Sequence, residues 1–277
     1  MNEQEPRPGR QNRWADSKKE DFPWWLAAVI LIGATLIWRV VSDDLYLNIL
    51  STLMRGVQLT IFVTLVSFFL ASLLGLGLAL AAGSRWLVIR QGARFYIEVV
   101  RGIPIIVLLL YVAFVLAPAL VELRNWIGAQ IGLDPIRTRN FPLLWRAIIA
   151  LMIAYSAFIS EVFRAGLQSV DAGQIEAAKA LGLSRWHRFR FVVFPQAIRT
   201  ILPPLGNDFV ALVKDSSLVS VLGVADVTQL GKITAVGNFR YFETYNVVAL
   251  IYLTLTIGLS LLLRRFEKHL RRREERR

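Results

Sequence analysis

The chain has 277 residues, of which 55% are hydrophobic and 19% are charged, and its formal net charge is +12. It is more apolar than an ordinary soluble domain, with a mean hydropathy of +0.51, and charged blocks separate long apolar runs, as in multi-span membrane proteins. The basic residues lie beside these runs, which favours membrane orientation over nucleic-acid binding, and the absence of cysteine excludes disulfides and cysteine-ligated zinc.

The N-terminal part predicts a tail followed by a first membrane span. Residues 1–22 are polar and mixed in charge, and we expect them to form a disordered cytoplasmic tail. Trp24–Val41 is just long enough to cross a bilayer and begins with two tryptophans at interface height. Its late position and the lack of a small-residue cleavage site favour a retained anchor. Residues 23–42 are therefore predicted to be an additional N-terminal transmembrane helix.

Five further apolar runs predict five more spans: Val57–Ala82, Gly102–Leu120, Leu143–Phe163, Leu205–Leu222 and Val247–Leu263. In the first of them small residues recur every four positions, which predicts a stripe for close helix packing; they are Ser67, Ala71, Gly75, Ala79 and Gly83. The expected fold class is an all-α polytopic membrane protein with six transmembrane helices, followed by a basic cytoplasmic tail at residues 267–277.

The distribution of basic residues predicts the orientation of these spans. The N-terminal tail, the loops at 83–95 and 164–199, and the segment after residue 263 carry 22 lysines and arginines, whereas the alternate loops carry 7. Because basic residues accumulate on the cytoplasmic side of a membrane, both termini and the loop at 164–199 are predicted to be cytoplasmic.

No spacing in the chain predicts enzymatic or metal chemistry. The two histidines, His187 and His269, lie far apart in basic segments and in no metal-binding or nucleophile-activating pattern. A phosphate-binding loop around Gly231-Lys232 would need glycine at 226 and Ser or Thr at 233, but those residues are Asp226 and Ile233. We therefore expect no catalytic residue, no metal site and no bound cofactor, and any ATP with its Mg²⁺ should sit on a partner subunit.

The fifth predicted span is interrupted and polar. Pro195 and Pro203-Pro204 are expected to mark helix boundaries, with Pro204 in the first turn of a new helix, because proline lacks an amide proton and clashes with the preceding turn. The new helix would reach Leu222, about 28 Å away. Four polar residues fall within an arc of about 120° on it, namely Asn207, Asp208, Lys214 and Asp215. This face should meet protein or water because charge in lipid is costly.

Glu161 is a second isolated charge, at the cytoplasmic end of the fourth span. It could pair with Arg164 one turn further on, and Lys214 could pair with a carboxylate on a neighbouring helix. With such pairing, Glu161 and Lys214 would stabilise the structure or take part in gating. Alternatively, they would contact a polar substrate directly. The residues alone leave both interpretations open.

The predicted cytoplasmic loop at 171–195 resembles a pair of soluble helices. Asp171 or Ser169 can cap the first helix, on which Ile175, Ala178 and Leu181 share a side. Gly182 suits a helix-ending position with positive φ, and Ser184 can cap a second helix. Periodicity alone leaves two interpretations, an amphipathic element at the membrane surface and a knuckle that docks a partner.

Several motifs in the chain resemble a known family. The pattern E-A-A-x3-G-x9-V-x-F-P, from Glu176 to Pro195, is similar to the EAA loop of bacterial ABC importer permeases, which usually ends I-x-L-P. EVVRGIPIIV (98–107), SEVFRAGLQSV (160–170) and PQAIRTILPPLGNDFVALVKDSSLVSVLG (195–223) resemble the polar amino acid branch. The resemblance covers about residues 57–266, in the right order.

This resemblance implies a type I importer fold, with a five-helix core at 57–266, a cytoplasmic coupling helix and the anchor at 23–42 in front. It implies a permease subunit in the bacterial inner membrane that imports polar amino acids. Its expected partners are a cytoplasmic ATPase dimer, a second permease subunit (the same or a related chain), an extracytoplasmic amino acid-binding protein and membrane lipid. The alternative is an ion-coupled secondary transporter or channel subunit.

The resemblance also assigns roles to residues at matching positions. The coupling contacts to the ATPase fall on Glu176, Ala177, Ala178, Gly182 and Arg185. The substrate pathway or its gating falls on Glu161, Asn207, Lys214, Asp215 and Ser216. The family commonly has R-G-T-P followed by a glutamine four residues after the proline, whereas this chain has Ile103 before Pro104 and then Leu108. That departure weakens any direct transfer of substrate contacts.

Overall fold

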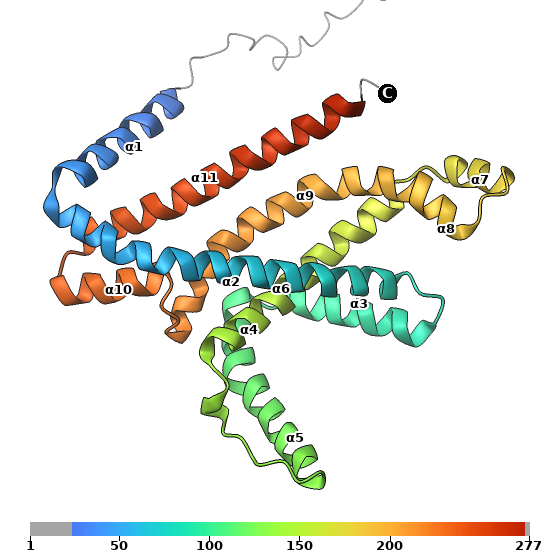
Figure 1. Cartoon of the computed structure of the whole chain (residues 1–277), viewed down its shortest axis with the longest axis horizontal. Coiled ribbons are helices and arrows are strands. Elements are labelled where there is room, and N and C mark those ends of the chain that lie inside the picture. The colour runs from blue at the N-terminus through green and yellow to red at the C-terminus, as the bar shows by residue number, and fades with distance from the viewer. Residues whose placement is uncertain (1–23, 275–277) are drawn as a thin grey trace, which may run out of the picture.

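The computed structural model describes residues 24–274, so the tail expected at 1–22 and the last residues, 275–277, lie outside it. Within 24–274 the chain is helical and contains no strand (Figure 1). The long helices are α1 (Trp24–Ser42), α2 (Asp44–Ala82), α3 (Leu87–Gly102), α6 (Leu143–Gln168), α9 (Phe194–Asp215) and α11 (Tyr241–Glu274). The shorter ones are α4 (Ile105–Tyr111), α5 (Ala117–Gln130), α7 (Ala172–Ala180), α8 (Arg185–Arg188) and α10 (Val227–Asn238).

Four of the described helical segments are long and apolar enough to cross a membrane. They are Asp44–Ala82, Ile105–Gln130, Leu143–Gln168 and Tyr241–Phe266. The second comprises α4, a π-helical turn at Val112–Leu116 and α5. Helix α1 contributes a shorter apolar helix, Leu31–Ser42, and α9 is polar, although its 22 residues measure about 33 Å. The chain is thus a multi-pass membrane protein, and the spans at α1 and α9 remain predictions.

Helix α2 corrects the expected boundary between the first two spans. The spans predicted at 23–42 and 57–82 left residues 43–56 outside any helix, but α2 already begins at Asp44, where the side chain of Asp43 accepts a hydrogen bond from the Leu45 amide at 2.9 Å. The helix has 39 residues and a length of about 58 Å, which is roughly twice the hydrocarbon thickness. Hydropathy marks where the apolar run begins, and the cap marks where the helix begins.

Helix α9 corrects the expected break at the proline pair. It runs from Phe194 to Asp215 with Pro203 and Pro204 inside it, and a 3₁₀ segment, Ser216–Leu222, then replaces the predicted last turns. Pro195 does lie in the first turn of α9, but the π-helical segment Phe189–Val193 leads into it without a loop. Membrane helices tolerate internal prolines where neighbouring groups satisfy the freed backbone groups. Just after the proline pair α9 packs closely on α11, since a Cβ added at Gly206 would lie 3.2 Å from the Leu263 side chain.

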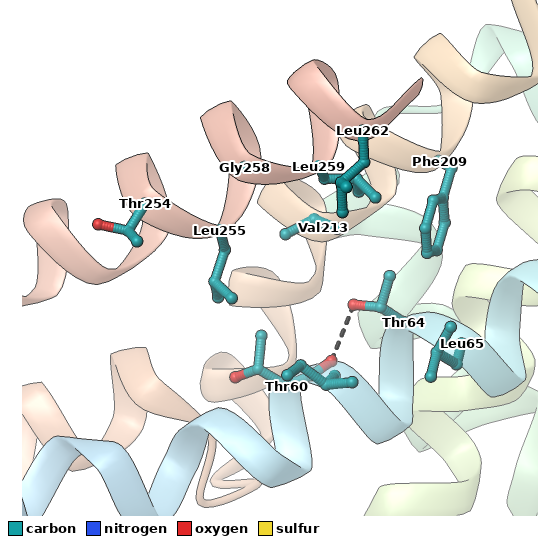
Figure 2. A pocket seen from close by; sticks show the side chains of 11 residues that line it. Thr60, Thr64, Leu65, Phe209, Val213, Thr254, Leu255, Gly258, Leu259 and Leu262 are labelled. Atoms are coloured by element: carbon teal, nitrogen blue, oxygen red, sulfur yellow. Dashed lines mark hydrogen bonds between the residues drawn. The ribbon is translucent and has the colours of Figure 1, made fainter. Parts of the chain in front are cut away.

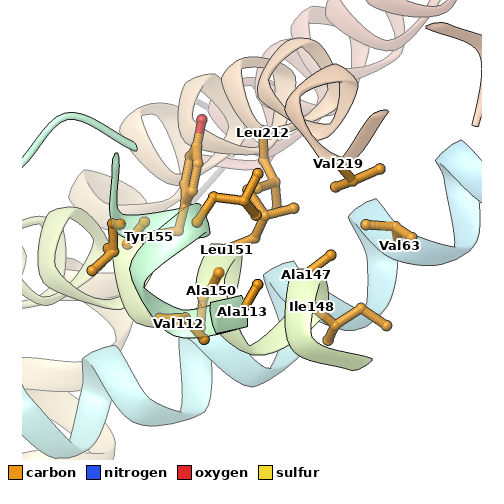
Figure 3. Close-up of a cluster of buried hydrophobic side chains, with 14 of the residues drawn as sticks. Val63, Val112, Ala113, Ala147, Ile148, Ala150, Leu151, Tyr155, Leu212 and Val219 are labelled. Atoms are coloured by element: carbon orange, nitrogen blue, oxygen red, sulfur yellow. The ribbon is translucent and has the colours of Figure 1, made fainter. Parts of the chain in front are cut away.

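The main core lies between α2 and α6. Ser67, Ala71, Gly75 and Ala79 are all buried along α2, which confirms the predicted stripe, while Gly83 lies just beyond the end of the helix. A Cβ added at Gly75 would lie 3.0 Å from both the Ile159 side chain and the Ser156 carbonyl oxygen of α6. Figure 3 shows the adjoining cluster, in which Val63, Ala147, Leu151 and Leu212 bring α2, α6 and α9 together.

A buried carboxylate joins α2, α10 and α11 at one end of the molecule. Asp226 is fully buried and accepts hydrogen bonds from the Gln229 amide at 2.9 Å and from the Tyr252 hydroxyl of α11 at 3.0 Å. Burial raises the pKa of the Asp226 carboxyl, and these donors oppose the rise. A Cβ added at Gly56 of α2 would lie 2.6 Å from the Val227 amide nitrogen. The backbones of α2 and α10 are therefore in direct contact here, and the Tyr252 side chain joins α11 to them.

A buried arginine fastens the segment between α5 and α6. The guanidinium of Arg146 donates to the carbonyl oxygens of Phe141 at 2.9 Å, Ala113 at 3.0 Å and Thr138. The side chain of Asn125 in α5 both donates to and accepts from Ile136. The loop at 131–142 is therefore attached to both neighbouring helices.

We expect Gly75→Leu to weaken the α2–α6 packing, because the added side chain meets backbone and a branched side chain. Overpacking of this kind costs about 1–3 kcal/mol, so the apparent Tm of the purified protein in detergent should fall by about 2–10 °C. Gly77→Leu is the matched control, since a Cβ at Gly77 meets nothing within 4 Å. Equal Tm values for the two variants would contradict the close approach.

Candidate functional site

The segment 171–195 forms a short helical hairpin at one end of the molecule (Figure 1). The Asp171 side chain caps α7 by accepting a hydrogen bond from the Gln174 amide at 3.2 Å. Ser169 is not the cap, because its hydroxyl donates to the Gly166 carbonyl at the end of α6. The Ser184 hydroxyl accepts from the His187 amide at 3.3 Å and caps α8. The predicted pair of capped short helices is confirmed.

Gly182 makes the turn between the two helices. Its φ is +75°, in the left-handed region that favours glycine. The Gly182 amide donates to the Lys179 carbonyl at 3.0 Å, and the Leu183 amide donates to the Ala178 carbonyl at 3.1 Å, so the end of α7 is closed by a helix-ending motif. A Cβ at Gly182 would meet nothing within 4 Å, which leaves this turn open to an approaching surface.

The hairpin presents apolar side chains outward. Ala178 is buried, but Leu181, which was predicted to share its side, is 81% exposed. Trp186 is 63% exposed and stacks on Phe189. Large apolar side chains gathered on an exposed helical pair indicate a contact surface for another protein or for the membrane. The helical periodicity did not predict the exposure of Leu181, because α7 ends one residue earlier and the turn directs the Leu181 side chain outward.

Of the five coupling residues predicted in this hairpin, Ala178 alone packs inward. Glu176, Ala177, Gly182 and Arg185 are all exposed on the hairpin. The predicted set is therefore brought to one element, with one small residue that holds α7 in place and four residues that a partner can reach.

The hairpin is fastened to α6 and α9. The Gln196 side chain of α9 donates to Gln174 of α7 and to the Val192 carbonyl. The hydroxyl of Ser169, the residue that follows α6, lies within hydrogen-bond distance of the Thr200 hydroxyl of α9, at 3.1 Å. A Cβ at Gly166 of α6 would lie 2.2 Å from the Ile201 side chain of α9. Helices α6 and α9 are therefore in close contact at the point where the hairpin joins them.

Helix α9 carries the predicted polar face. Asp215 accepts a hydrogen bond from the Tyr155 hydroxyl of α6 at 2.7 Å. Asp208 is half-buried, and its Oδ2 is buried with no hydrogen-bond partner among the described residues. Asn207 and Lys214 are exposed, and Lys214 makes no ion pair within residues 24–274. The pairing of Lys214 with a carboxylate of a neighbouring helix, one of the two alternatives that the sequence left open, is not found within residues 24–274, and one side of α9 offers unpaired polar groups.

Ser216 behaves differently from the rest of the predicted polar set. It is fully buried, and its hydroxyl donates to the Val213 carbonyl at 2.7 Å. The side chain thus satisfies the end of α9, where the helix changes to the 3₁₀ segment, and it is not presented to a cavity.

Glu161 lies in a separate charged cavity. It pairs with Arg164, as predicted, with a hydrogen bond of 3.1 Å from Arg164 Nε. The cavity measures about 420 Å³ and lies between the end of α2, α3 and the last turns of α6. Its charged and amide side chains are Arg94, Glu98, Arg101, Glu161, Arg164 and Gln168.

Of these six residues only Glu161 was predicted as a site residue; those not predicted are Arg94, Glu98 and Arg101 of α3, and Arg164 and Gln168 of α6. The guanidinium of Arg101 lies 5.7 Å from the ring centre of Phe158, a distance at which cation–π attraction operates. The grouping of the three α3 residues could have been predicted from the sequence, because Arg94, Glu98 and Arg101 recur at i, i+4 and i+7 and so share a helix face. Within residues 24–274 no group of three His, Cys, Asp or Glu side chains could hold a metal ion.

Comparisons with known proteins give a consistent result. Residues 71–275 match the family model described as "Binding-protein-dependent transport system inner membrane component". The chain is 35% identical over 219 residues to the glutamine transport system permease protein GlnP of Escherichia coli (strain K12), covering 79% of this chain and 93% of that protein. It is 34% identical to the probable amino-acid permease protein YxeN of Bacillus subtilis (strain 168), covering 83% and 96%.

A solved structure of an amino acid ABC transporter with histidines is also similar. Its matched chain is 36% identical and gives a TM-score of 0.68, with 82% of this chain and 98% of that chain covered. The likeness therefore extends over nearly the whole of the solved subunit, in sequence and in fold.

We expect Tyr155→Phe to loosen the contact between α6 and α9, because Asp215 loses the hydroxyl that it accepts from. A hydrogen bond to a charged group contributes about 1.5–3 kcal/mol, so the apparent Tm should fall by about 3–10 °C. Tyr111→Phe, at a tyrosine that is 55% exposed, should leave Tm unchanged. An unaltered Tm for Tyr155→Phe would show that the bond does not hold these helices.

Proposed function

We propose that this chain, which belongs to the family of binding-protein-dependent transport system inner membrane components, works as the permease subunit of an ATP-binding-cassette importer for polar amino acids. As a permease subunit it is non-catalytic, and a separate subunit hydrolyses ATP. The relatives and the similar solved structure are ABC transporter permeases, so the alternative of an ion-coupled transporter or channel is not supported.

The observation that carries the proposal is the α7–α8 hairpin. It has an open turn at Gly182 and exposed Leu181 and Trp186, and it is fastened to two helices of the core. We assign the docking of the ATPase to this hairpin, through Glu176, Ala177, Gly182 and Arg185, with Ala178 holding α7 on the core. ATP and Mg²⁺ belong to the partner ATPase dimer.

The polar side of α9 and the charged cavity supply candidates for the pathway. Asn207, Lys214 and Asp215 lie on the polar side of α9, and Glu161 lies in the cavity with α3. Unpaired polar groups in a membrane helix are stable only against water or another protein. We therefore place a second permease subunit, either the same chain or a related one, opposite this side, so that the pathway runs between the two.

The orientation follows from the basic residues and completes the assembly. The hairpin and both termini lie in the cytoplasm, because 22 of the loop and tail lysines and arginines lie on that side and 7 on the other. The opposite end, with α10 and the loop at 131–142, then faces the extracytoplasmic space, where an amino acid-binding protein delivers its ligand. The membrane is the bacterial inner membrane.

The mechanism couples the hairpin to the pathway through rigid contacts. Closure of the ATPase dimer on ATP draws the two hairpins together, and the Gly166–Ile201 and Ser169–Thr200 contacts transmit that movement to α6 and α9. The cavity between the permeases then changes from inward-open to outward-open, and hydrolysis resets it.

We expect Gly182→Trp to release the ATPase from the purified complex, because an indole at the open turn obstructs docking. A clash at the centre of an interface costs about 2 kcal/mol or more, so the ATPase recovered per permease should fall at least about tenfold. Co-purification followed by quantitative gel analysis measures this ratio.

Gly132→Trp is the matched control, because Gly132 has a φ of +74° and a Cβ there also meets nothing within 4 Å. Both variants carry the same backbone strain, but Gly132 lies in the loop at 131–142, which is proposed to face the extracytoplasmic space, away from the ATPase. Retention of the ATPase by Gly182→Trp, or equal loss from both variants, would overturn the assignment of the docking turn.

A further inference from the structure

An apolar groove runs between α2, α9 and α11. Figure 2 shows it, with Thr60, Thr64 and Leu65 of α2 on one wall, and Thr254, Leu255, Gly258, Leu259 and Leu262 of α11 on the other. Phe209 and Val213 of α9 form the floor. The groove has a volume of about 330 Å³, and a Cβ added at Gly258 would meet nothing within 4 Å. The space at Gly258 is therefore unfilled by the chain's own side chains.

The three threonines of the groove do not make it polar. The Thr64 hydroxyl donates to the Thr60 carbonyl at 2.8 Å, and the Thr254 hydroxyl donates to the Leu250 carbonyl at 2.8 Å. The Thr60 hydroxyl accepts from the Val227 amide at 3.3 Å. All three hydroxyls are engaged by backbone groups, so the groove offers contact to hydrocarbon and no recognition of a polar solute.

The groove faces away from the proposed pathway. At 100° per residue, Phe209 and Val213 lie roughly 180° around α9 from the middle of its polar arc. The polar arc meets α6 through Asp215 and Tyr155, whereas the groove opens beside the exposed side chains of Ile61, Leu65 and Leu262. Two of its walls belong to segments long and apolar enough to cross the membrane, and their exposed apolar side chains are suited to contact with acyl chains.

The length of the groove matches one leaflet. From Thr254 to Leu262 the wall formed by α11 rises about 12 Å, against about 15 Å for half of the hydrocarbon layer. Arg265 follows Leu262 by three residues and Gly258 by seven, so it continues the same face of α11. Arg265 is exposed and stands where a lipid headgroup would lie. Arg264 is also exposed but is turned about 100° away from Arg265.

We propose that this groove is a binding site for an anionic phospholipid, with one acyl chain along Gly258 and the phosphate at Arg265. In the proposed orientation the lipid comes from the cytoplasmic leaflet. A lipid bound there fills the space between α2 and α11, on the side of α9 that faces away from the proposed pathway. It therefore contacts α9, the helix that the coupling hairpin is proposed to move. A single basic residue at the membrane surface gives a preference of about fivefold for an anionic over a zwitterionic headgroup, equivalent to about 1 kcal/mol.

Photocrosslinking of the intact chain tests the site directly. The purified complex is reconstituted in phosphatidylcholine vesicles with a minor share of phosphatidylglycerol that carries a diazirine in its acyl chain, and adducts are mapped by mass spectrometry. We expect adducts concentrated at residues 254–262 and 60–65, and about fivefold fewer when phosphatidylcholine carries the diazirine. The measurement needs neither ATP nor a binding protein, so it is independent of the proposed transport function.

Matched variants separate the two parts of the site. Gly258→Phe, or Gly258→Leu if the larger variant does not fold, should reduce adducts in the groove several-fold, whereas Gly77→Phe on the lipid-exposed side of α2 should not. Arg265→Gln should remove the preference for phosphatidylglycerol, and Arg264→Gln should retain it.

Three results would overturn the proposal. Adducts spread evenly over the exposed apolar surface, including Phe114 and Trp126 of the α4–α5 segment, would show that the groove binds no particular lipid. Equal labelling by the two headgroups would remove the role of Arg265. Protection of residues 254–262 from both lipids would show that a helix, from α1 or from a second subunit, covers the groove.

Discussion

The close approach of α2 to α6 is the constraint on which the other features depend. It is possible only because Ser67, Ala71, Gly75 and Ala79 leave a smooth surface on α2. The hydrophobic effect does not press helices together inside lipid, so this contact rests on dispersion and shape. Helix α6, held in this way, carries Tyr155 toward α9 and Glu161 toward α3, and it ends at the coupling hairpin.

Polar side chains are hydrogen-bonded at two connections between helices, where they make the structure rigid. Along α9, beside the proposed pathway, some polar groups are left unpaired. Arg146 donates to three carbonyl oxygens, and Asp226 accepts from backbone and tyrosine, so the two connections at the proposed outer face are fixed. By contrast, Lys214 and the buried oxygen of Asp208 have no partner among the described residues. Charge left unpaired in a membrane is costly, so this side of α9 is expected to meet water or another protein.

The sequence predicts local features well. The caps at Asp171 and Ser184, the positive φ of Gly182 and the Glu161–Arg164 pair are each decided by neighbours within a few residues. Features decided by distant contacts were wrong or missed. The cavity with α3 needs two helices far apart in sequence, and α9 continues through Pro203 and Pro204 beside α11, where Gly206 lies close to Leu263. The start of α2 was missed for a different reason, because its cap at Asp43 is local but lies well before the apolar run.

In the proposed mechanism, movement of the α7–α8 hairpin, driven by ATP on a partner, opens and closes a pathway along α9. Uptake of a labelled polar amino acid by vesicles containing this chain with its ATPase, with a binding protein supplied on the opposite side, tests it most directly. The account predicts accumulation only when hydrolysable ATP is present on the side of the hairpin. Accumulation driven by an ion gradient in the absence of ATP would contradict it.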